Sequence, residues 1–319
     1  MTFEQASLHF EEGKRYNTAV GLYRRLYGER LQKLVIDAGF SCPNRDGTIS
    51  TGGCTYCDNA AFHPCYSTAG KSIHRQIDEG IEFHKVRYRN ASRYLAYFQS
   101  FSNTYAPLER LKKLYSEALS HPDIAGLVIG TRPDCIDEAK LDYLAALQDS
   151  GKIIQVEYGI ESCYDKTLRT INRGHNFECA VKAVEMTASR GIHTGAHFIL
   201  GLPGETEKML LEQCSMINEL KIKSVKFHQL QIIKGTAMEA EKKAMPEDFI
   251  SWDLDGYLEF FIDILELLRP SLSIERVAGE VPPRFVEKPQ WGLVRNFQIL
   301  HLLDKQLELR NTWQGKMVF

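Results

Sequence analysis

The stretch KLVIDAGFSCPNRDGTISTGGCTYC, residues 33–57, joins an apolar run to a glycine-rich loop that contains three cysteines. The run from Lys33 to Ala38 is rich in aliphatic residues and stops at a glycine, which predicts a buried strand. In the loop, eleven residues separate Cys42 from Cys54, and two separate Cys54 from Cys57. Three thiols gathered behind one strand predict a metal site at the carboxyl end of that strand.

Apolar runs beside turn residues recur along the rest of the chain. Segments with the apolar spacing of helices lie between them, such as PLERLKKLYSEALS from Pro107 and DEAKLDYLAALQDSG from Asp137. Strands that alternate with helices pair in parallel through right-handed crossovers. The sequence therefore predicts an α/β fold, a partial (β/α)6 TIM-like barrel, with strands at Lys33 to Ala38, Arg93 to Gln99, Gly126 to Gly130, Ile153 to Tyr158, Thr194 to Leu200 and Ser224 to Ile232.

Three regions follow from this pattern. Residues 33–280 form the predicted barrel, residues 1–32 an N-terminal helical extension and residues 281–319 a small C-terminal cap. Barrels of this kind carry their chemistry at the carboxyl ends of the strands. The cysteine loop begins at such an end.

Composition restricts the partners that the chain can have. It carries 39 Lys and Arg against 41 Asp and Glu, so a net charge of −2 gives no overall attraction to nucleic acid, and RNA binding would need a local basic patch. No apolar run reaches the roughly 18 residues of a membrane span, and the N-terminus lacks the apolar core of a signal peptide. We therefore expect a cytoplasmic protein with no membrane partner and with reduced cysteines.

The three cysteines fit two kinds of metal centre. A [4Fe–4S] cluster held by only three thiolates keeps one iron open for another ligand. A zinc ion would need a fourth ligand, for which His63 and Cys65 are the candidates. A zinc ribbon usually brings a second Cys-x-x-Cys pair, which the sequence lacks, so the pattern favours the cluster and leaves zinc open. Gly47, Gly52 and Gly53 would let the loop wrap tightly.

Further segments accompany the cysteine loop: FQSFSNTYAP from Phe98, GTRPDCI from Gly130, VEYGIES with TINRGHN between Val156 and Asn176, and ILGLPGET from Ile199. With the Cys-x11-Cys-x2-Cys spacing, they resemble radical S-adenosylmethionine proteins of the branch related to the elongator catalytic subunit. The wider superfamily uses Cys-x3-Cys-x2-Cys, and this branch shares the long first gap. The resemblance implies a [4Fe–4S] cluster on the three cysteines, with S-adenosylmethionine at its open iron.

The resemblance also implies which residues hold the cofactor. Asn103 and Thr104 would hold the methionine amino end, Arg173 the methionine carboxylate, and Glu157 a ribose hydroxyl or the substrate. The adenosine portion would lie on the turn formed by Gly201, Pro203 and Gly204.

The residues alone leave ordinary alternatives open for each of these assignments. Asn103 and Thr104 fit a polar turn, and the glycine turn fits a capped helix start. Arg173 fits a surface arginine near a helix start. Glu157 lies in an apolar strand, where a buried carboxylate needs a partner, and an ion pair with Arg132 or Arg173 would also satisfy it.

Within this branch, the segments look like those of bacterial proteins that act on the wobble uridine of transfer RNA. The resemblance implies conversion of 5-carboxymethylaminomethyluridine to 5-aminomethyluridine, through hydrogen abstraction by a 5′-deoxyadenosyl radical. Glu157 would take part in catalysis, and Arg132 or Lys234 would hold the substrate carboxylate. A flavodoxin or ferredoxin would supply electrons, and no stable protein partner is inferred. The alternatives are a small-molecule or protein substrate, and a non-catalytic, metal-stabilised RNA-binding protein.

RNA binding requires a basic surface with aromatic side chains. The segment KVRYRNASRY from Lys85 contains four cations and two tyrosines without an acidic residue. We predict an RNA contact here, although a solvated helix face has the same pattern. The predicted contacts are Lys85, Arg87, Arg89 and Arg93, and the residues that could add to them are Lys221, Lys223, Lys226, Lys234, Arg24, Arg25 and Arg30.

Overall fold

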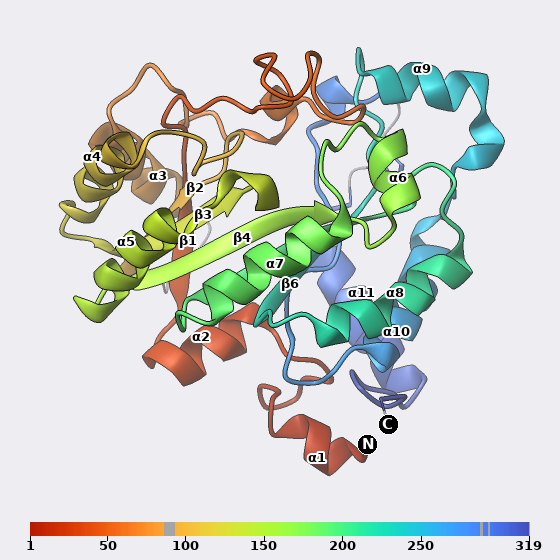
Figure 1. Ribbon diagram of the computed structural model, residues 1–319. Helices are drawn as coiled ribbons and strands as arrows, with labels where there is room; N and C mark the ends of the chain where they lie inside the picture. The colour runs from red at the N-terminus through yellow and green to blue at the C-terminus, as the bar shows by residue number, and fades with distance from the viewer. Residues whose placement is uncertain (86–92, 288–289, 293, 319) are drawn as a thin grey trace.

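A seven-stranded parallel sheet forms the centre of the computed structural model, which describes residues 1–85, 93–287, 290–292 and 294–318 (Figure 1). Each strand pairs with the strands before and after it in the chain, in the order β1 to β7. The strands are β1 (Leu31–Ile36), β2 (Arg93–Phe98), β3 (Ile124–Thr131), β4 (Ile153–Glu161), β5 (His193–Leu200), β6 (Ser224–Gln229) and β7 (Ser273–Arg276).

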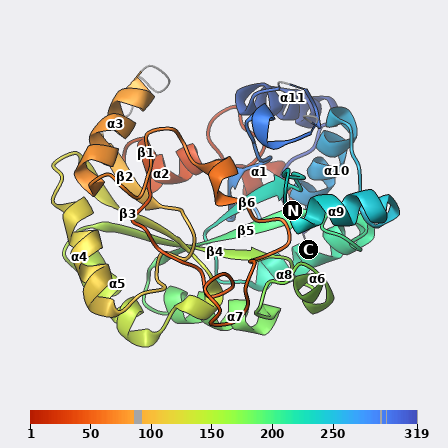
Figure 2. The ribbon, with the colours of Figure 1, turned by 90° about the horizontal axis from the view of Figure 1, so that it is seen from above.

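The predicted α/β partial barrel is confirmed, but the predicted number of strands is wrong by one. Six strands lie where the apolar runs placed them, and β7 was not predicted. Its sequence, SIER, has four residues of which two are charged, so it lacks the apolar run that indicates a strand. The parallel sheet curls without closing, with helices along its outer side (Figure 2).

Helices cover the outer face of the sheet because each buries one apolar side against it, and polar residues cap the starts of several of them. In α4, buried Leu111, Tyr115 and Ala118 follow one another at helical spacing. Asp137 and Asn176 accept hydrogen bonds from the first turns of α5 and α7. These helices are α3 (Ile73–Lys85), α4 (Leu108–Leu119), α5 (Glu138–Asp149), α7 (Phe177–Ala188), α8 (Glu207–Glu219) and α10 (Leu254–Leu267).

The two ends of the chain lie close together below the sheet (Figure 1), and both contact the segment that contains β7. The Gln314 side chain accepts a hydrogen bond from the Asn17 amide and donates to the carbonyl of Leu272. Thr18 forms a bridge with Ile274 of β7, so the N-terminal segment covers this sheet edge. The remaining helices are α1 (Phe3–Ser7), α2 (Ala19–Tyr27), α6 (Asp165–Thr170), α9 (Ala237–Ala244) and α11 (Asn296–Leu309), with short 3₁₀ turns at Asn59–Phe62, Pro133–Cys135, Pro246–Asp248 and Pro283–Phe285.

The two faces of the sheet have different chemistry. Phe198 of β5 and Phe227 of β6 are register partners, stack at 6.1 Å between ring centroids and are buried in the apolar core. Alternate residues of a strand point to opposite faces, so the neighbouring His197 and Lys226 point to the inner face. The inside of the barrel is therefore polar.

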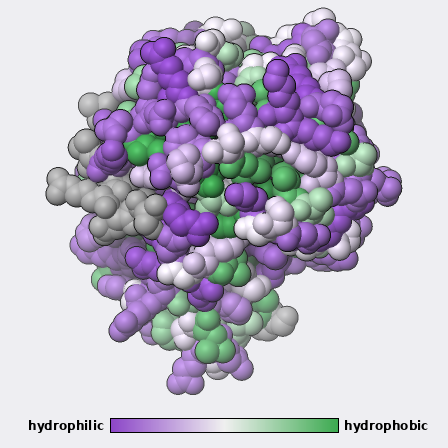
Figure 3. All heavy atoms as spheres, turned by 90° about the vertical axis from the view of Figure 1, so that its left-hand side faces the viewer, coloured by the Kyte–Doolittle hydropathy of each residue, from purple (hydrophilic) through white to green (hydrophobic). Residues whose placement is uncertain are grey.

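The surface is mostly hydrophilic. On the face shown in Figure 3, apolar residues gather in a recessed central region that hydrophilic side chains surround. Within the residues that the structure describes, no helix combines the length and apolar character needed to cross a membrane.

Candidate active site

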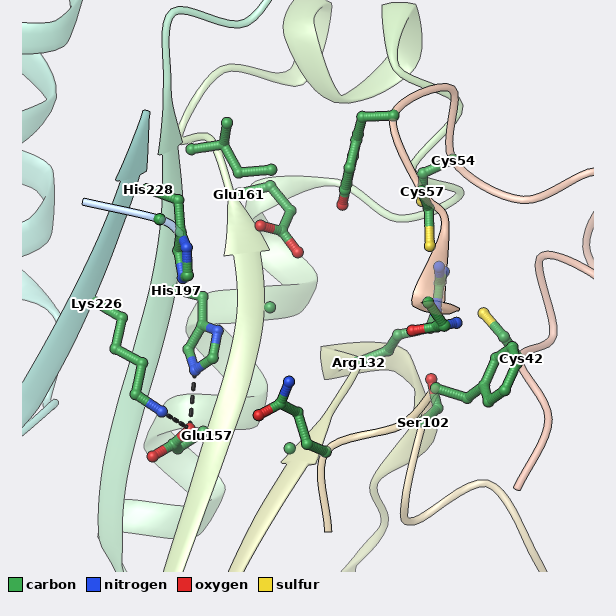
Figure 4. Close-up of a pocket in the computed structure, with 18 of the residues that line it drawn as sticks. Cys42, Cys54, Cys57, Ser102, Arg132, Glu157, Glu161, His197, Lys226 and His228 are labelled. Carbon is green, nitrogen blue, oxygen red and sulfur yellow. Dashed lines mark hydrogen bonds and ion pairs between the residues drawn. The ribbon is translucent and has the colours of Figure 1, made fainter. Parts of the chain in front are cut away.

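The three cysteines of the loop after β1 line one cavity at the carboxyl end of the sheet (Figure 4). This inner cavity, of about 240 Å³, has Cys42, Cys54 and Cys57 on one wall, and Glu157 with Lys226 on the opposite wall. The first strand therefore delivers its cysteines to the end of the barrel where the sequence placed them.

The loop that carries the cysteines depends on glycine. Gly53, next to Cys54, has a φ of +83°, a conformation that other residues rarely adopt. A Cβ atom at Gly53 would also lie 2.9 Å from Nε of Arg45. Arg45 in turn donates to the carbonyl of Cys57 at 2.5 Å, and the Asn172 side chain donates to the carbonyl of Gly53 at 2.8 Å. The predicted tight wrap is therefore confirmed.

Nitrogen donors surround the buried thiol of Cys54. Nδ2 of Asn44 and Nη1 of Arg173 each lie 3.5 Å from its Sγ. Arg173 also donates to the carbonyl of Gly159 at 2.5 Å and lies 3.5 Å from a carboxylate oxygen of Glu161. Donors directed at a metal-bound sulfur stabilise its negative charge and tune a redox centre.

Several buried polar atoms near the cysteines have no protein partner among the described residues. They are Oδ1 of Asn44, Oγ of Ser102, Nη1 of Arg132 and Nε of Arg173. Buried polar atoms are normally hydrogen-bonded, so a group of unpartnered ones indicates a ligand. Donors and acceptors are both present, as the amino and carboxylate groups of S-adenosylmethionine require. The residues therefore fit this cofactor.

The zinc alternative does not fit the geometry. His63 is directed at Oγ of Ser100, at 2.7 Å, and its Nδ1 lies 3.6 Å from Asp37. Cys65 is exposed, and neither residue lines the inner cavity. Across the described residues, no three Cys, His, Asp or Glu side chains lie close enough together to hold one metal ion. A cubane cluster instead binds each thiolate to a different iron, so its ligands are spread more widely.

Glu157 of β4 lies at the centre of the opposite wall, with 1% of its side chain exposed. It accepts hydrogen bonds from Nζ of Lys226 at 2.5 Å and Nζ of Lys33 at 2.6 Å. The hydroxyl of Tyr97 and Nε2 of His197 also lie within hydrogen-bond distance, at 2.7 and 2.8 Å. The alternative of an ion pair with Arg132 or Arg173 is not what the structure shows, because the cations that pair with Glu157 are Lys33 of β1 and Lys226 of β6.

Lys33 and Lys226 keep the Glu157 carboxylate on this wall ionised. Burial alone would raise the pKa of Glu157, but Lys226 and Lys33 outweigh it and hold that pKa well below its usual value. Burial lowers the pKa of Lys226 to about 8, against the attraction of Glu157. Burial, followed by nearby positive charge, lowers the pKa values of His197 and His228. At neutral pH the wall therefore has an ionised carboxylate, ammonium groups and neutral imidazoles.

The other two residues proposed for substrate contact lie in different surroundings. Arg132 lines the inner cavity, where its guanidinium forms a two-pronged pair with Asp134 at 2.8 and 2.7 Å. Lys234 is exposed and does not line this cavity.

Five of the residues predicted for cofactor binding do not line the inner cavity. Asn103 donates to the carbonyl of Gly130, and Thr104 bonds to Thr131 and to the carbonyl of Cys135. The neighbouring Phe101 and Ser102 line the cavity instead. The predicted turn residues Gly201, Pro203 and Gly204 also lie away from the lining, to which this segment contributes Ile199.

The predicted RNA patch is described only in part. Arg87 and Arg89 lie outside the described residues. Lys85 pairs with Glu82 within α3, and Arg93 pairs with Glu29 at 3.0 Å. Lys226, which was expected to extend this surface, is only 6% exposed and points into the barrel, so that expectation is wrong.

Sequence reasoning found Glu157 but missed its surroundings. Lys226 and His228 occupy alternate positions of β6, and His197 interrupts an apolar strand in the same way as Glu157. Polar residues at alternate positions of a buried strand could have identified Lys226, His228 and His197 as cavity residues. Arg276 of β7 also lines the cavity. It could not be identified in this way, because β7 was not predicted as a strand.

Known families match most of the chain. The model for the radical SAM superfamily matches residues 46–216, and the model for the radical SAM C-terminal domain matches residues 222–309. The chain belongs to the radical SAM superfamily. This radical SAM enzyme accordingly uses a [4Fe–4S] cluster and S-adenosylmethionine, as the resemblance implied.

Relatives of this radical SAM enzyme include YtqA from Bacillus subtilis, which is 35% identical over 309 residues that span 95% of this chain and 92% of YtqA. A tRNA uridine(34) acetyltransferase from Methanocaldococcus infernus is 28% identical over 134 residues, or 41% of this chain and 24% of the acetyltransferase. Among solved structures, the Elp3 protein of Methanocaldococcus infernus superposes with a TM-score of 0.66 at 16% identity. That match covers 89% of this chain and 64% of Elp3, and it shows a shared fold.

Proposed function

We propose that this enzyme acts on the wobble uridine of transfer RNA and converts 5-carboxymethylaminomethyluridine to 5-aminomethyluridine. The two nucleosides differ by a carboxymethyl group on the side-chain nitrogen, so the reaction breaks a carbon–nitrogen bond. Abstraction of a hydrogen atom from the carbon between that nitrogen and the carboxylate would leave a carbon radical. Loss of one further electron, for which the oxidised cluster would be the acceptor, would give an iminium that water hydrolyses to the free amine and glyoxylate.

The observation that carries this proposal is the division of the inner cavity into two unlike walls (Figure 4). The cysteine wall presents sulfur and unpartnered polar atoms. The opposite wall carries Lys226, paired with Glu157, and its register neighbour Arg276, a cation that suits an anionic substrate group. A substrate with a carboxylate at the end of a short flexible chain can reach from one wall toward the other.

The partial match to a tRNA uridine(34) acetyltransferase supports the nucleic-acid substrate, because that relative modifies the wobble position. The proposal places the protein in the cytoplasm, where transfer RNA is modified, and requires an electron donor such as a flavodoxin or ferredoxin.

In this proposal, Cys42, Cys54 and Cys57 hold the cluster, and the unpartnered atoms beside them hold the cofactor. When bound, the two groups supply radical hydrogen-abstraction chemistry. Asn44 and Arg173 direct N–H groups at the sulfur of Cys54. Glu157 keeps Lys33 and Lys226 in place, and the surrounding barrel limits the access of water to the cavity.

Nucleoside analysis tests the proposal directly. We expect transfer RNA from a strain that lacks this protein to accumulate 5-carboxymethylaminomethyluridine and to lose the nucleosides formed after it, as measured by mass spectrometry. Reduced enzyme with S-adenosylmethionine should then convert that transfer RNA in vitro. Unchanged nucleosides in both experiments would rule out this substrate and favour a small molecule or a protein.

A further inference from the structure

Arg276 lines the inner cavity as a cation whose side chain has no partner in the described part of the chain. Five cations line this cavity, and four of them bond to protein atoms: Arg45 to Cys57, Arg132 to Asp134, Arg173 to Gly159, and Lys226 to Glu157. Among the described residues, the Arg276 side chain makes neither a hydrogen bond nor an ion pair. A guanidinium facing a cavity without a counter-ion is a ready site for an anion.

The sheet register directs Arg276 to the inside of the barrel. It lies opposite Lys226 in the β6–β7 ladder, after an irregularity that leaves Glu275 without a register partner. Residues opposite each other project to the same face of a sheet, and Lys226 projects inward to Glu157. The Gln229 side chain accepts from the Gly279 amide at 2.7 Å and donates to the Gly279 carbonyl at 3.1 Å, which fixes the segment behind β7.

Arg276 also lies where the inner cavity meets a second, larger space. This lateral gap, of about 760 Å³, separates β1 from β7 at the open side of the barrel. The two spaces share Tyr97, Gln99, Lys226 and Arg276. A substrate that enters from the side therefore passes Arg276 before it reaches the cysteine wall.

We propose that Arg276 binds the carboxylate of the substrate side chain through a two-pronged contact at this junction. The inference rests on the proposed function and names the residue that selects its substrate. A carboxylate that leaves water needs a cation with matching geometry, which the planar fork of arginine provides. With the carboxylate held here, the adjacent carbon faces into the inner cavity. Arg276 replaces Arg132 and Lys234 as the residue that holds the substrate carboxylate. Arg132 is already paired with Asp134, and Lys234 does not line the inner cavity.

The test compares two transfer RNAs that differ only in charge. One carries 5-carboxymethylaminomethyluridine, and the other carries the same nucleoside with a carboxamide in place of the carboxylate. For reconstituted wild-type enzyme we expect kcat/KM to favour the carboxylate by about 100-fold, the size of a lost charged contact in a buried site. The preference should fall to near unity in R276Q and take an intermediate value in R276K, because lysine keeps the charge but lacks the fork.

Matched controls separate this role from a loss of structure. Arg190, which pairs with Asp142 on the helical surface, provides the control variant R190Q, which should keep the wild-type preference. A wild-type preference in both R276Q and R276K would overturn the assignment. If R276Q does not fold, R276K alone decides, and full discrimination by it overturns the assignment. If wild-type enzyme cleaves S-adenosylmethionine but converts neither transfer RNA, the proposed function fails, and the assignment fails with it.

Discussion

Individual buried charges determine the character of the inner cavity, and Glu157 is held by more than one of them. Lys33 and Lys226 both contact it, and Lys33 also pairs with Glu275 at 2.5 Å. Such a network is sensitive to the loss of one member, because a buried charge without compensation costs several kcal/mol. The ion-pair network therefore affects both the stability of the fold and the orientation of the Glu157 carboxylate.

We expect K226M to lower the free energy of unfolding by about 3 kcal/mol, since it leaves Glu157 with one lysine in a low-dielectric site. The double variant E157Q/K226M should lose less than the sum of the two single variants, because the neutral amide no longer needs the ammonium group. Urea denaturation of all four proteins measures this coupling. Strictly additive losses would show that the pair does not act as a unit.

Glu205 is another buried carboxyl, just before α8, and none of the described residues places a cation beside it. Burial raises its pKa to about 7, and a hydrogen bond of 2.6 Å from Ser162 only partly opposes this. The folded protein therefore binds this proton more tightly than the unfolded chain does. Stability should fall as the pH rises from about 4.5 to about 7, by about 3 kcal/mol in total.

The variant E205Q should lack this pH dependence, because glutamine reproduces the neutral carboxyl and can still accept from Ser162. At pH 8 we expect E205Q to be more stable than the wild type, and at pH 4 the two should be alike. Urea denaturation at both pH values checks the sign. Equal stability of the two proteins at pH 8 would mean that the folded protein accommodates the ionised carboxylate.

At the scale of elements, the cysteine loop depends on Gly53 for its shape. A side chain there meets both a positive φ and Arg45, so we expect G53A to move Cys54 and to reduce the iron bound after anaerobic reconstitution by at least about half. Gly13 has a similar φ of +74° but has open space around it, which makes G13A the matched control. Equal iron contents in the two variants would show that the clash with Arg45 has no effect on the cluster.

Local sequence signals accounted for much of the fold. Apolar runs located β1 to β6, and the helical segment that opens at Asp137 located α5, which Asp137 caps. The strand β7 escaped because four residues with two charges carry too little periodicity. The strand β7 forms because it pairs with β6 and is buried against the barrel, and these contacts compensate for its weak local preference for strand structure.

Long-range geometry explains what the sequence could not reveal about the site. The cysteines are close in the chain, so their spacing alone brought them together. Lys33, Glu157 and Lys226 come from three strands and meet only because the sheet curls. Arg276 faces Lys226 because of an irregularity in one ladder, and no pattern in the sequence encodes that register.

At the scale of the whole molecule, the open side of the barrel connects the inner cavity to the surface. The lateral gap that provides this connection is lined by aromatic residues, including Tyr23, Tyr66 and Phe83. Phe83 belongs to α3, which ends at Lys85, the first residue of the predicted RNA patch. The predicted patch therefore begins next to the opening through which a nucleotide would reach the cavity. A macromolecular substrate that binds beside the gap can place one base inside without entering the barrel as a whole.

This arrangement predicts where the affinity for transfer RNA resides. Neutralising Lys85 and Arg93 together should weaken binding and reduce the slope of log affinity against log salt by up to about 2, because each lost phosphate contact removes about one released counterion. The control is K182Q/K208Q, which removes two exposed lysines that also pair with helix neighbours, on α7 and α8. These two helices lie across the molecule from α3 (Figure 2), so the control should keep both the affinity and the slope. Equal slopes for K85Q/R93Q and the wild type, measured by filter binding between 50 and 200 mM salt, would place the RNA on another surface.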